Sequence, residues 1–283
     1  MLPSNVNLRP ATTDDRSALS SLLNFEYYIH RHLDWRPALD WLGSRPFWVL
    51  ERQNRLLAAL ACPPDPPEVA WVRLFVNNTY LRVEEAWRFL FSAAYKELSQ
   101  ISYNQMAALA LHEWFARLLQ QNGFEFLQDI IVLEWNRCIP SVIPLPGNLL
   151  INEMQSEDLP EVQVVDNLSF DPLWRISLDS LRRSYNQSTY ATVAVFDGRI
   201  VGYQISTDAP SGAHLARLAV RPDFQRQYIG YGLVLDLQNY FLQRRADRIT
   251  VNTQCDNHAS LALYEKLNFK RTGERFPVFI YPR

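Results

Sequence analysis

The 283-residue chain has an ordinary globular composition and almost no net charge, and both properties exclude several classes of protein. Hydrophobic residues make up 48% of the chain and charged residues 20%, which argues against intrinsic disorder, while 9 glycines are too few for glycine-rich linkers or collagen-like repeats. Lysine and arginine total 28 against 30 acidic residues, so the chain lacks the overall basic excess of a dedicated nucleic-acid binder. At about 150 residues per domain, this length predicts two domains.

The cysteines and the apolar runs indicate the compartment. Cys62, Cys138 and Cys255 are far apart and odd in number, which fits a reducing cytoplasm better than a disulfide framework or a CxxC motif. The first fifteen residues lack a basic segment followed by an apolar stretch, so no signal peptide is expected. No uncharged apolar run reaches 18 residues. We therefore expect a cytoplasmic protein that does not cross a membrane.

The two halves of the chain repeat each other. Phe47–Ala61 reads as strand, turn and strand, and so does Ala191–Ser206, at an offset of 144 residues. At the same offset Trp71–Val76 falls on Leu215–Val220, which matches Arg73 with Arg217. Two further blocks keep offsets of 145 and about 143, namely Asn122–Phe124 with Leu267–Phe269 and Leu8–Asp15 with Leu150–Asp158. Four aligned blocks predict a duplicated domain of roughly 140 residues.

A proline-rich stretch marks the boundary between the copies. Pro140, Pro144, Pro146 and Gly147 are spaced in a way that helices and central strands tolerate poorly, so they indicate a linker. We expect domains at residues 1–140 and 148–283.

The second copy predicts an α+β fold, a mixed sheet with flanking helices. Asp197-Gly198 between two apolar runs is a hairpin signal, and Asn257 is a plausible helix N-cap. The expected elements in chain order are a strand at Leu150–Met154, helical and loop segments from Glu157 to Tyr185, the hairpin, a strand at Ala213–Val220, a helix from Gly230, a strand at Arg248–Thr253, a helix at Asn257–Leu267 and a strand at Pro277–Tyr281.

Two stretches of this copy carry chemistry. Leu215–Leu237 reads as a strand, a loop with basic and amide side chains, and a glycine-marked helix start, where free N–H groups and the positive end of the helix dipole can hold a pyrophosphate. Asp256–Phe269 reads as a helix that places Tyr264 two turns after its N-cap. Each stretch alone is more often a plain turn or a core aromatic. The occurrence of both stretches in this order favours a functional role over a purely structural one.

In this order the two stretches resemble motifs A and B of the GNAT superfamily of N-acetyltransferases. The family's loop reads Q/R-x-x-G-x-G/A; Gln225 matches its first position and Gly230 its second glycine, while Tyr228 replaces the first glycine. A register starting at Gln227 also matches, but it lengthens the distance from the strand by two residues. The family's helix N-x-x-A-x-x-L-Y is matched by Asn257 and Tyr264. Two copies in one chain resemble the tandem-GNAT arrangement, with the N-terminal copy degenerate.

The resemblance implies an acetyl-CoA site in the C-terminal copy. The pantetheine arm would lie along the strand at Leu218–Val220, and the pyrophosphate would meet the amides of the following loop. Tyr264 would give its proton to the departing thiolate. No metal is implied. The cofactor-binding residues would be Leu218, Ala219, Val220, Gln225, Arg226, Gln227, Tyr228, Ile229, Gly230, Tyr231 and Asn257.

The general base is less well defined. Ribosomal-protein N-acetyltransferases of this family carry a glutamate on the strand before the tyrosine helix, where this chain has Asn252. His214 is a candidate proton relay through water, as is Asp208, although His214 also fits ordinary strand polarity. A missing base favours an acceptor amine of low pKa. Aromatic residues in the segment where such enzymes build the acceptor wall are Phe170, Trp174, Tyr185 and Tyr190, which core packing explains equally well.

The N-terminal copy is predicted to bind no acetyl-CoA. Its counterpart of the phosphate loop, Leu81–Arg88, has no glycine and carries Glu84 and Glu85, and the position of Tyr264 falls on Leu119 or Gln120. The H-x-H pair His30 and His32 has no third ligand at a recognisable spacing, so solvated histidines are expected there.

The resulting hypothesis is an acetyl-CoA-dependent N-acetyltransferase acting on an amine of unknown identity, with a non-catalytic CoA-binding or interaction module as the alternative. Neither the acceptor nor the oligomeric state follows from the sequence.

Overall fold

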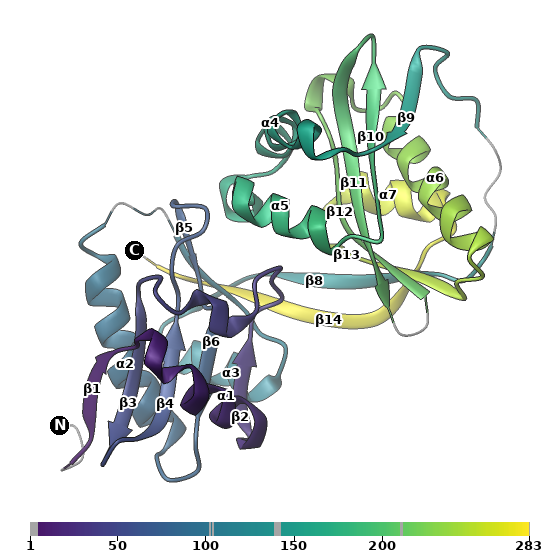
Figure 1. Ribbon diagram of the computed structural model, residues 1–283. Helices are drawn as coiled ribbons and strands as arrows, with labels where there is room; N and C mark the ends of the chain where they lie inside the picture. The colour runs from purple at the N-terminus through teal and green to yellow at the C-terminus, as the bar shows by residue number, and fades with distance from the viewer. Residues whose placement is uncertain (1–4, 102, 104, 139–142, 210–211, 283) are drawn as a thin grey trace. The chain divides into compact units, whose positions relative to one another are not determined.

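The computed structural model describes residues 5–101, 103, 105–138, 143–209 and 212–282, and the chain divides into two compact units (Figure 1). Unit 1 consists of Met1–Leu127 with Pro277–Arg283, and unit 2 of Gln128–Phe276. The units thus exchange short segments relative to the expected domains, because residues 128–140 lie in unit 2 and 277–283 in unit 1. Among the described residues, no helix has the length and apolar character needed to cross a membrane.

Unit 1 contains an antiparallel sheet with a helix layer on each face. α1 (Arg16–Phe25) packs on one face, and α2 (Val83–Leu98) packs on the other. Successive residues of the central strand explain this, since Ala58 belongs to the cluster under α2 and Ala59 to the cluster under α1. The strand order is β1 (Asn7–Pro10), β3 (Phe47–Arg52), β4 (Arg55–Ala61), β6 (Leu74–Asn77) and β2 (Tyr28–Arg31).

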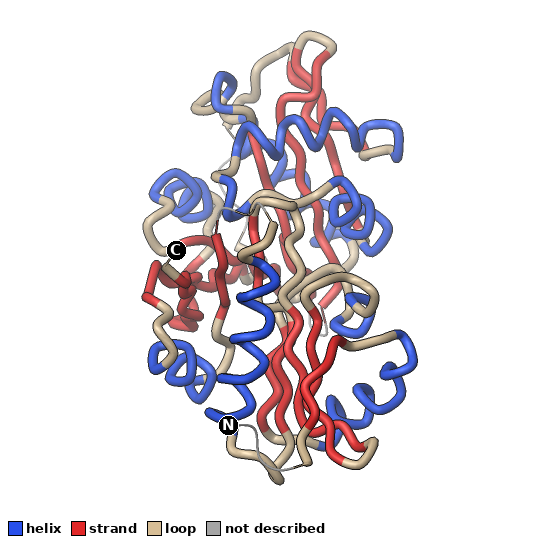
Figure 2. Tube along the Cα trace, turned by 90° about the vertical axis from the view of Figure 1, so that its left-hand side faces the viewer, coloured by secondary structure: helices blue, strands red, loops and turns tan. Residues whose placement is uncertain are grey.

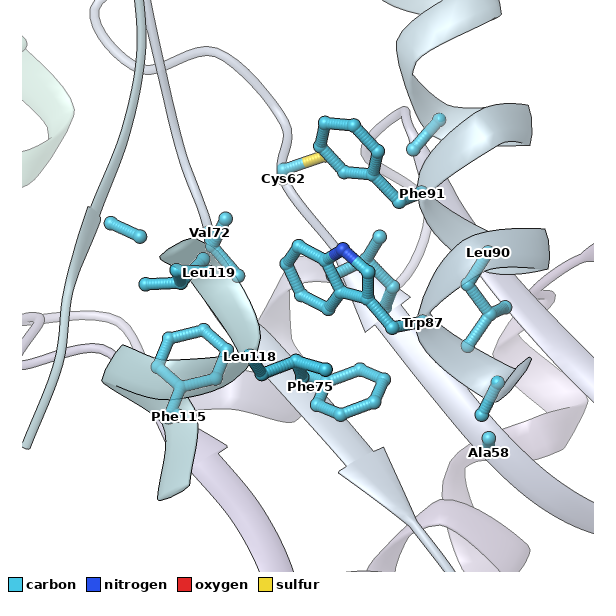
Figure 3. Packing of buried hydrophobic residues seen from close by; sticks show 14 of the residues in the cluster. Ala58, Cys62, Val72, Phe75, Trp87, Leu90, Phe91, Phe115, Leu118 and Leu119 are labelled. Atoms are coloured by element: carbon cyan, nitrogen blue, oxygen red, sulfur yellow. The ribbon is translucent and has the colours of Figure 1, made fainter. Parts of the chain in front are cut away.

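A second group of strands completes unit 1. β5 (Val69–Trp71) pairs in parallel with β7 (Gln105–Leu109), and β7 pairs antiparallel with the C-terminal end of β14 (Lys270–Tyr281). α3 (Glu113–Gln121) follows β7. In the core, the ring of Trp87 lies 5.1 Å from that of Phe75 (Figure 3).

Unit 2 is built on a mixed sheet. β12 and β13 are parallel and the other neighbours antiparallel. α4 (Leu159–Ser169) and α5 (Leu178–Gln187) lie on one side of the sheet, and α6 (Ile229–Gln243) and α7 (His258–Lys266) on the other (Figures 1 and 2). The order is β9 (Leu149–Glu153), β10 (Tyr190–Phe196), β11 (Arg199–Ala209), β12 (Gly212–Val220), β13 (Arg248–Gln254) and the C-terminal end of β8 (Glu125–Trp135).

The duplication is visible in the backbone. The hairpin register breaks between Leu50 and Glu51 in unit 1 and between Ala194 and Val195 in unit 2, again 144 residues apart. The turn of the second hairpin has positive φ at Asp197 (49°) and Gly198 (77°), the geometry that the Asp-Gly pair predicts. The α+β prediction is confirmed.

The last strand differs from its prediction. β14 begins at Lys270, seven residues before the expected start at Pro277. The side chains from Lys270 to Arg275 are exposed, so this part of the strand shows no apolar alternation to read. Pro144, Pro146 and Gly147 lie in irregular chain as expected, while Pro140 lies outside the described residues.

Candidate functional site

The two parallel strands of unit 2 separate at their C-terminal ends. Their ladder runs from Gly212 opposite Arg248 to Leu215 opposite Val251, although β12 continues for five more residues. The other edge of β12 stays paired with β11 as far as Val220. The register shift between β11 and β12 leaves Ala216 as the extra residue of a bulge, which bends the strand where the ladder ends. The strands therefore open into a gap lined by backbone.

The loop after β12 leads into a helix N-terminus. The side chain of Gln225 donates to the carbonyl of Val220 at 3.1 Å. Tyr228 caps α6 with φ 60° and ψ 13°, a left-handed conformation that glycine adopts more readily. Tyr228 thus keeps a glycine-like backbone in the motif position where it replaces glycine. The first N–H groups of a helix have no intrahelical acceptor, and here they begin at Ile229.

Gly230 lies where there is little space for a side chain. A Cβ at this position would lie 3.3 Å from Cδ2 of Leu263 and 3.5 Å from Cγ2 of Val220. The start of α6 therefore lies close against both β12 and α7. The N–H groups of the first turn have no intrahelical acceptor, and a helix N-terminus of this kind suits a phosphate group.

Tyr264 is buried in the core of unit 2. Its side chain is 4% exposed, and its ring centroid lies 5.5 Å from that of Phe269. Burial raises the pKa of this phenol above its usual value of 10, so the group stays protonated at neutral pH. Asn257 is the N-cap of α7, as predicted, because its Oδ1 accepts from the backbone N–H of Ser260 at 3.1 Å.

A buried charge cluster, which the sequence analysis missed, stands on the opposite face of the sheet. Arg217 follows the bulge, and its Nε donates to Oδ2 of Asp166 on α4 at 2.6 Å. The hydroxyl of Tyr203 on β11 donates to the same oxygen at 2.5 Å. The Asp166 side chain is fully buried. Burial and the neighbouring carboxylate raise the pKa of Tyr203. The cluster ties α4 to the strands beside the gap, and the match of Arg217 with Arg73 was its only sequence signal.

The predicted acceptor wall is only partly assembled. The guanidinium of Arg217 lies 4.1 Å from the ring centroid of Phe170 and donates to the carbonyl of Trp174 at 2.8 Å. Tyr185 instead donates to the carbonyl of Met154, and the hydroxyl of Tyr190 donates to Asp236 on α6 at 2.8 Å, on the other face of the sheet. Phe170 and Trp174 therefore share a location with Arg217, and Tyr190 does not.

The histidines are placed by packing. Nδ1 of His214 lies 2.9 Å from Oγ1 of Thr250, and burial lowers the pKa of His214. His30 is fully buried and stacks on Phe115 at 3.9 Å, so the expectation of a solvated histidine was wrong for this residue. Its flat ring fills the aromatic core. Among the described residues, no group of three or more His, Cys, Asp or Glu side chains is arranged to hold a metal ion.

Unit 1 has acidic residues at the corresponding helix start. α2 begins at Val83, and Glu84 and Glu85 lie in its first turn. Leu119, one of the two counterparts of Tyr264, is fully buried among apolar side chains. The first turn of α2 in unit 1 thus carries carboxylates, whereas the first turn of α6 in unit 2 carries Gly230 and backbone N–H groups without intrahelical acceptors.

Comparison with known proteins identifies the family. Residues 152–269 match the acetyltransferase (GNAT) family. A putative [ribosomal protein bS18]-alanine N-acetyltransferase from Bacillus subtilis is 24% identical over 127 residues, which cover 44% of this chain and 83% of the relative. The fold and the matched domain define an acyltransferase. Residues 152–269 therefore form a GNAT-family acetyltransferase domain.

Solved structures extend the fold likeness over the whole chain. A GCN5-related N-acetyltransferase from Sphaerobacter thermophilus matches 99% of this chain and 96% of its own, with a TM-score of 0.65 and 14% identity. A tandem GNAT protein from the clavulanic acid biosynthesis pathway matches 97% of this chain and 98% of its own, with a TM-score of 0.62 and 18% identity. The tandem arrangement of two GNAT-like domains is thereby confirmed.

Proposed function

We propose that unit 2 transfers an acetyl group from acetyl-CoA to an amine, with the gap between β12 and β13 as the cofactor site. The observation that carries this proposal is the end of the parallel ladder at Leu215 and Val251, followed directly by a helix N-terminus. The family uses acetyl-CoA, and the N-terminus of α6 suits its pyrophosphate. When bound, this molecule supplies the thioester that is cleaved.

We assign the binding contacts to the backbone around the gap. Leu218, Ala219 and Val220 would pair with the pantetheine amides, and the loop from Gln225 to Tyr231 would hold the pyrophosphate. A backbone N–H near Val220 would polarise the thioester carbonyl. Asn257 uses its Oδ1 for the helix cap, so its Nδ2 is the group that would donate to the pantetheine arm.

Tyr264 is our candidate for the general acid. Its raised pKa keeps the phenol protonated at neutral pH. The O–H would donate its proton to the sulfur as the C–S bond breaks, and the phenolate that remains would regain a proton from solvent. The acceptor amine attacks the carbonyl carbon directly and loses a proton to solvent or to His214 through water. Because burial lowers the pKa of His214, its imidazole is neutral at pH 7 and able to accept that proton.

The acceptor is left to experiment. The Bacillus subtilis relative is named for acetylation of an alanine of a ribosomal protein, so a peptide with an N-terminal alanine belongs in the test panel together with small amines. An α-amine has a lower pKa than a lysine side chain and depends less on a strong base.

The test measures release of the CoA thiol over this amine panel. We expect Tyr264→Phe to lower turnover about 10- to 1000-fold while acetyl-CoA affinity changes little, because general acids typically contribute about 10²–10⁴. The matched control is Tyr240→Phe, which removes a hydroxyl that donates to Thr189 in the same unit. Wild-type turnover in Tyr264→Phe would make Tyr264 a packing residue. Acetyl-CoA binding without turnover on any amine would favour the non-catalytic CoA-binding module.

A further inference from the structure

Unit 1 contains a cavity of about 370 Å³ that the proposed acetyl transfer does not use. It lies between α1, which contributes Leu23, and the chain that follows β2, which contributes His32 and Trp41. Arg73, in the interruption between β5 and β6, also lines it. All these residues belong to unit 1, on the α1 face of its sheet.

The lining of this cavity is cationic. Its charged side chains are the single acid Asp34 and the four arginines Arg16, Arg31, Arg36 and Arg73, of which Arg16 pairs with Asp40 beside the lining at 2.8 Å. His32 adds no charge at neutral pH, because burial and the nearby Arg73 lower its pKa. Such a cavity attracts anions.

Two buried donors of the cavity lack acceptors. Among the described residues, Nε of Arg73 and Nε1 of Trp41 have no hydrogen-bond partner. Arg73 is 7% exposed and Trp41 2% exposed. An unsatisfied buried donor is costly, so an acceptor brought by a ligand would stabilise both groups.

The matching arginine of unit 2, Arg217, has partners for its Nε that Arg73 lacks among the described residues. In unit 2, Nε of Arg217 is bound by Asp166 and by the hydroxyl of Tyr203. At offset 143 Asp166 falls on Leu23, and at offset 144 Tyr203 falls on Ala59. Unit 1 therefore lacks the carboxylate and the phenol that bind Nε of the matching arginine in unit 2, and its own buried acid, Asp34, pairs with Nη1 of Arg73 instead.

We propose that the cavity of unit 1 binds a small organic carboxylate, whose oxygens accept from Nε of Arg73 and Nε1 of Trp41. The ligand would stand where unit 2 has the carboxylate of Asp166. Asp34 already pairs with Nη1 of Arg73 at 2.9 Å and also lines the cavity, which leaves Nε as the donor for a ligand. Leu23, Ala38 and Leu39 supply apolar lining for the organic part.

The test follows the indole N–H signals of the full-length protein by two-dimensional NMR during titration with millimolar benzoate and acetate. Trp41→Phe identifies the Trp41 signal among those of the 8 tryptophans. We expect a saturable downfield shift of the Trp41 signal, with benzoate binding more tightly than acetate. Inorganic phosphate and chloride at equal ionic strength should produce no such shift.

Variants separate the site from general charge effects. By calorimetry, Trp41→Phe should weaken benzoate binding about 2- to 10-fold, the range expected for one lost hydrogen bond. Trp114→Phe, a matched change outside the cavity lining, should leave the affinity unchanged. The proposal is overturned if no indole signal shifts saturably, if the shifting signal belongs to another tryptophan, or if phosphate and chloride shift Trp41 equally.

Discussion

Removal of residues 1–147 should destroy the fold of unit 2, whereas a chain that begins at Gln128 should retain it. The C-terminal end of β8 pairs with β13 from Ile130 opposite Gln254 to Trp135 opposite Ile249. Three side chains of this segment belong to the core of unit 2: Ile131, Leu133 and Trp135, which are 4%, 3% and 1% exposed.

The expected loss is comparable with the whole stability of a domain. Deleting a buried leucine or isoleucine side chain costs about 2–5 kcal/mol, and deleting a buried tryptophan about 3–5 kcal/mol. The three together reach about 7–15 kcal/mol, against a typical unfolding free energy of about 5–15 kcal/mol. The truncation also leaves one edge of β13 unpaired, which promotes aggregation.

The assay compares fragments 148–276 and 128–276, both of which omit the last seven residues because these belong to unit 1. We expect the longer fragment to be soluble and to unfold cooperatively in urea, followed by circular dichroism, and the shorter one to aggregate. A soluble 148–276 fragment with a similar urea midpoint would refute the assignment of the β8 segment to the core of unit 2.

Three further predictions concern buried charge and cofactor binding. Asp166→Asn should lower the unfolding free energy by about 3–5 kcal/mol, because it leaves the buried Arg217 without its counterion. Replacing the whole cluster, with Asp166→Leu, Arg217→Met and Tyr203→Phe together, should cost much less, because no buried polar group of the cluster is then left without a partner. A loss below about 1 kcal/mol in the single variant, measured by urea unfolding, would contradict this. Burial lowers the pKa of His30 to about 4 from 6.5, so the unfolded chain binds a proton first as the pH falls. The unfolding free energy should therefore fall by about 3 kcal/mol as the pH drops from 6.5 to about 4, since one pKa unit corresponds to about 1.36 kcal/mol. His30→Phe should remove this pH dependence of the unfolding free energy, and an equal pH dependence in both proteins would count against the prediction. Calorimetric titration should give one acetyl-CoA site per chain, because Glu84 and Glu85 occupy the helix start in unit 1; two sites would disprove this.

The sequence by itself determined the features that depend on neighbouring residues. The Asp197-Gly198 turn, the Asn257 cap and the helix beginning near Gly230 are local, because turn dihedrals, caps and apolar spacing act over a few residues. The repeat offset was equally readable, since both copies keep the same order of apolar runs. These features were sufficient to predict the α+β fold, the tandem arrangement and the family.

Only the tertiary structure decided which segments complete each unit and which charges are buried. Only the last part of β14, from Pro277, was readable as a strand, and nothing local specifies that the end of β8 pairs with β13, more than 110 residues away in the chain. Arg217, His30 and Arg73 look like any polar residue until their surroundings are known. Burial and long-range pairing depend on contacts between distant segments, and local residue spacing does not encode them.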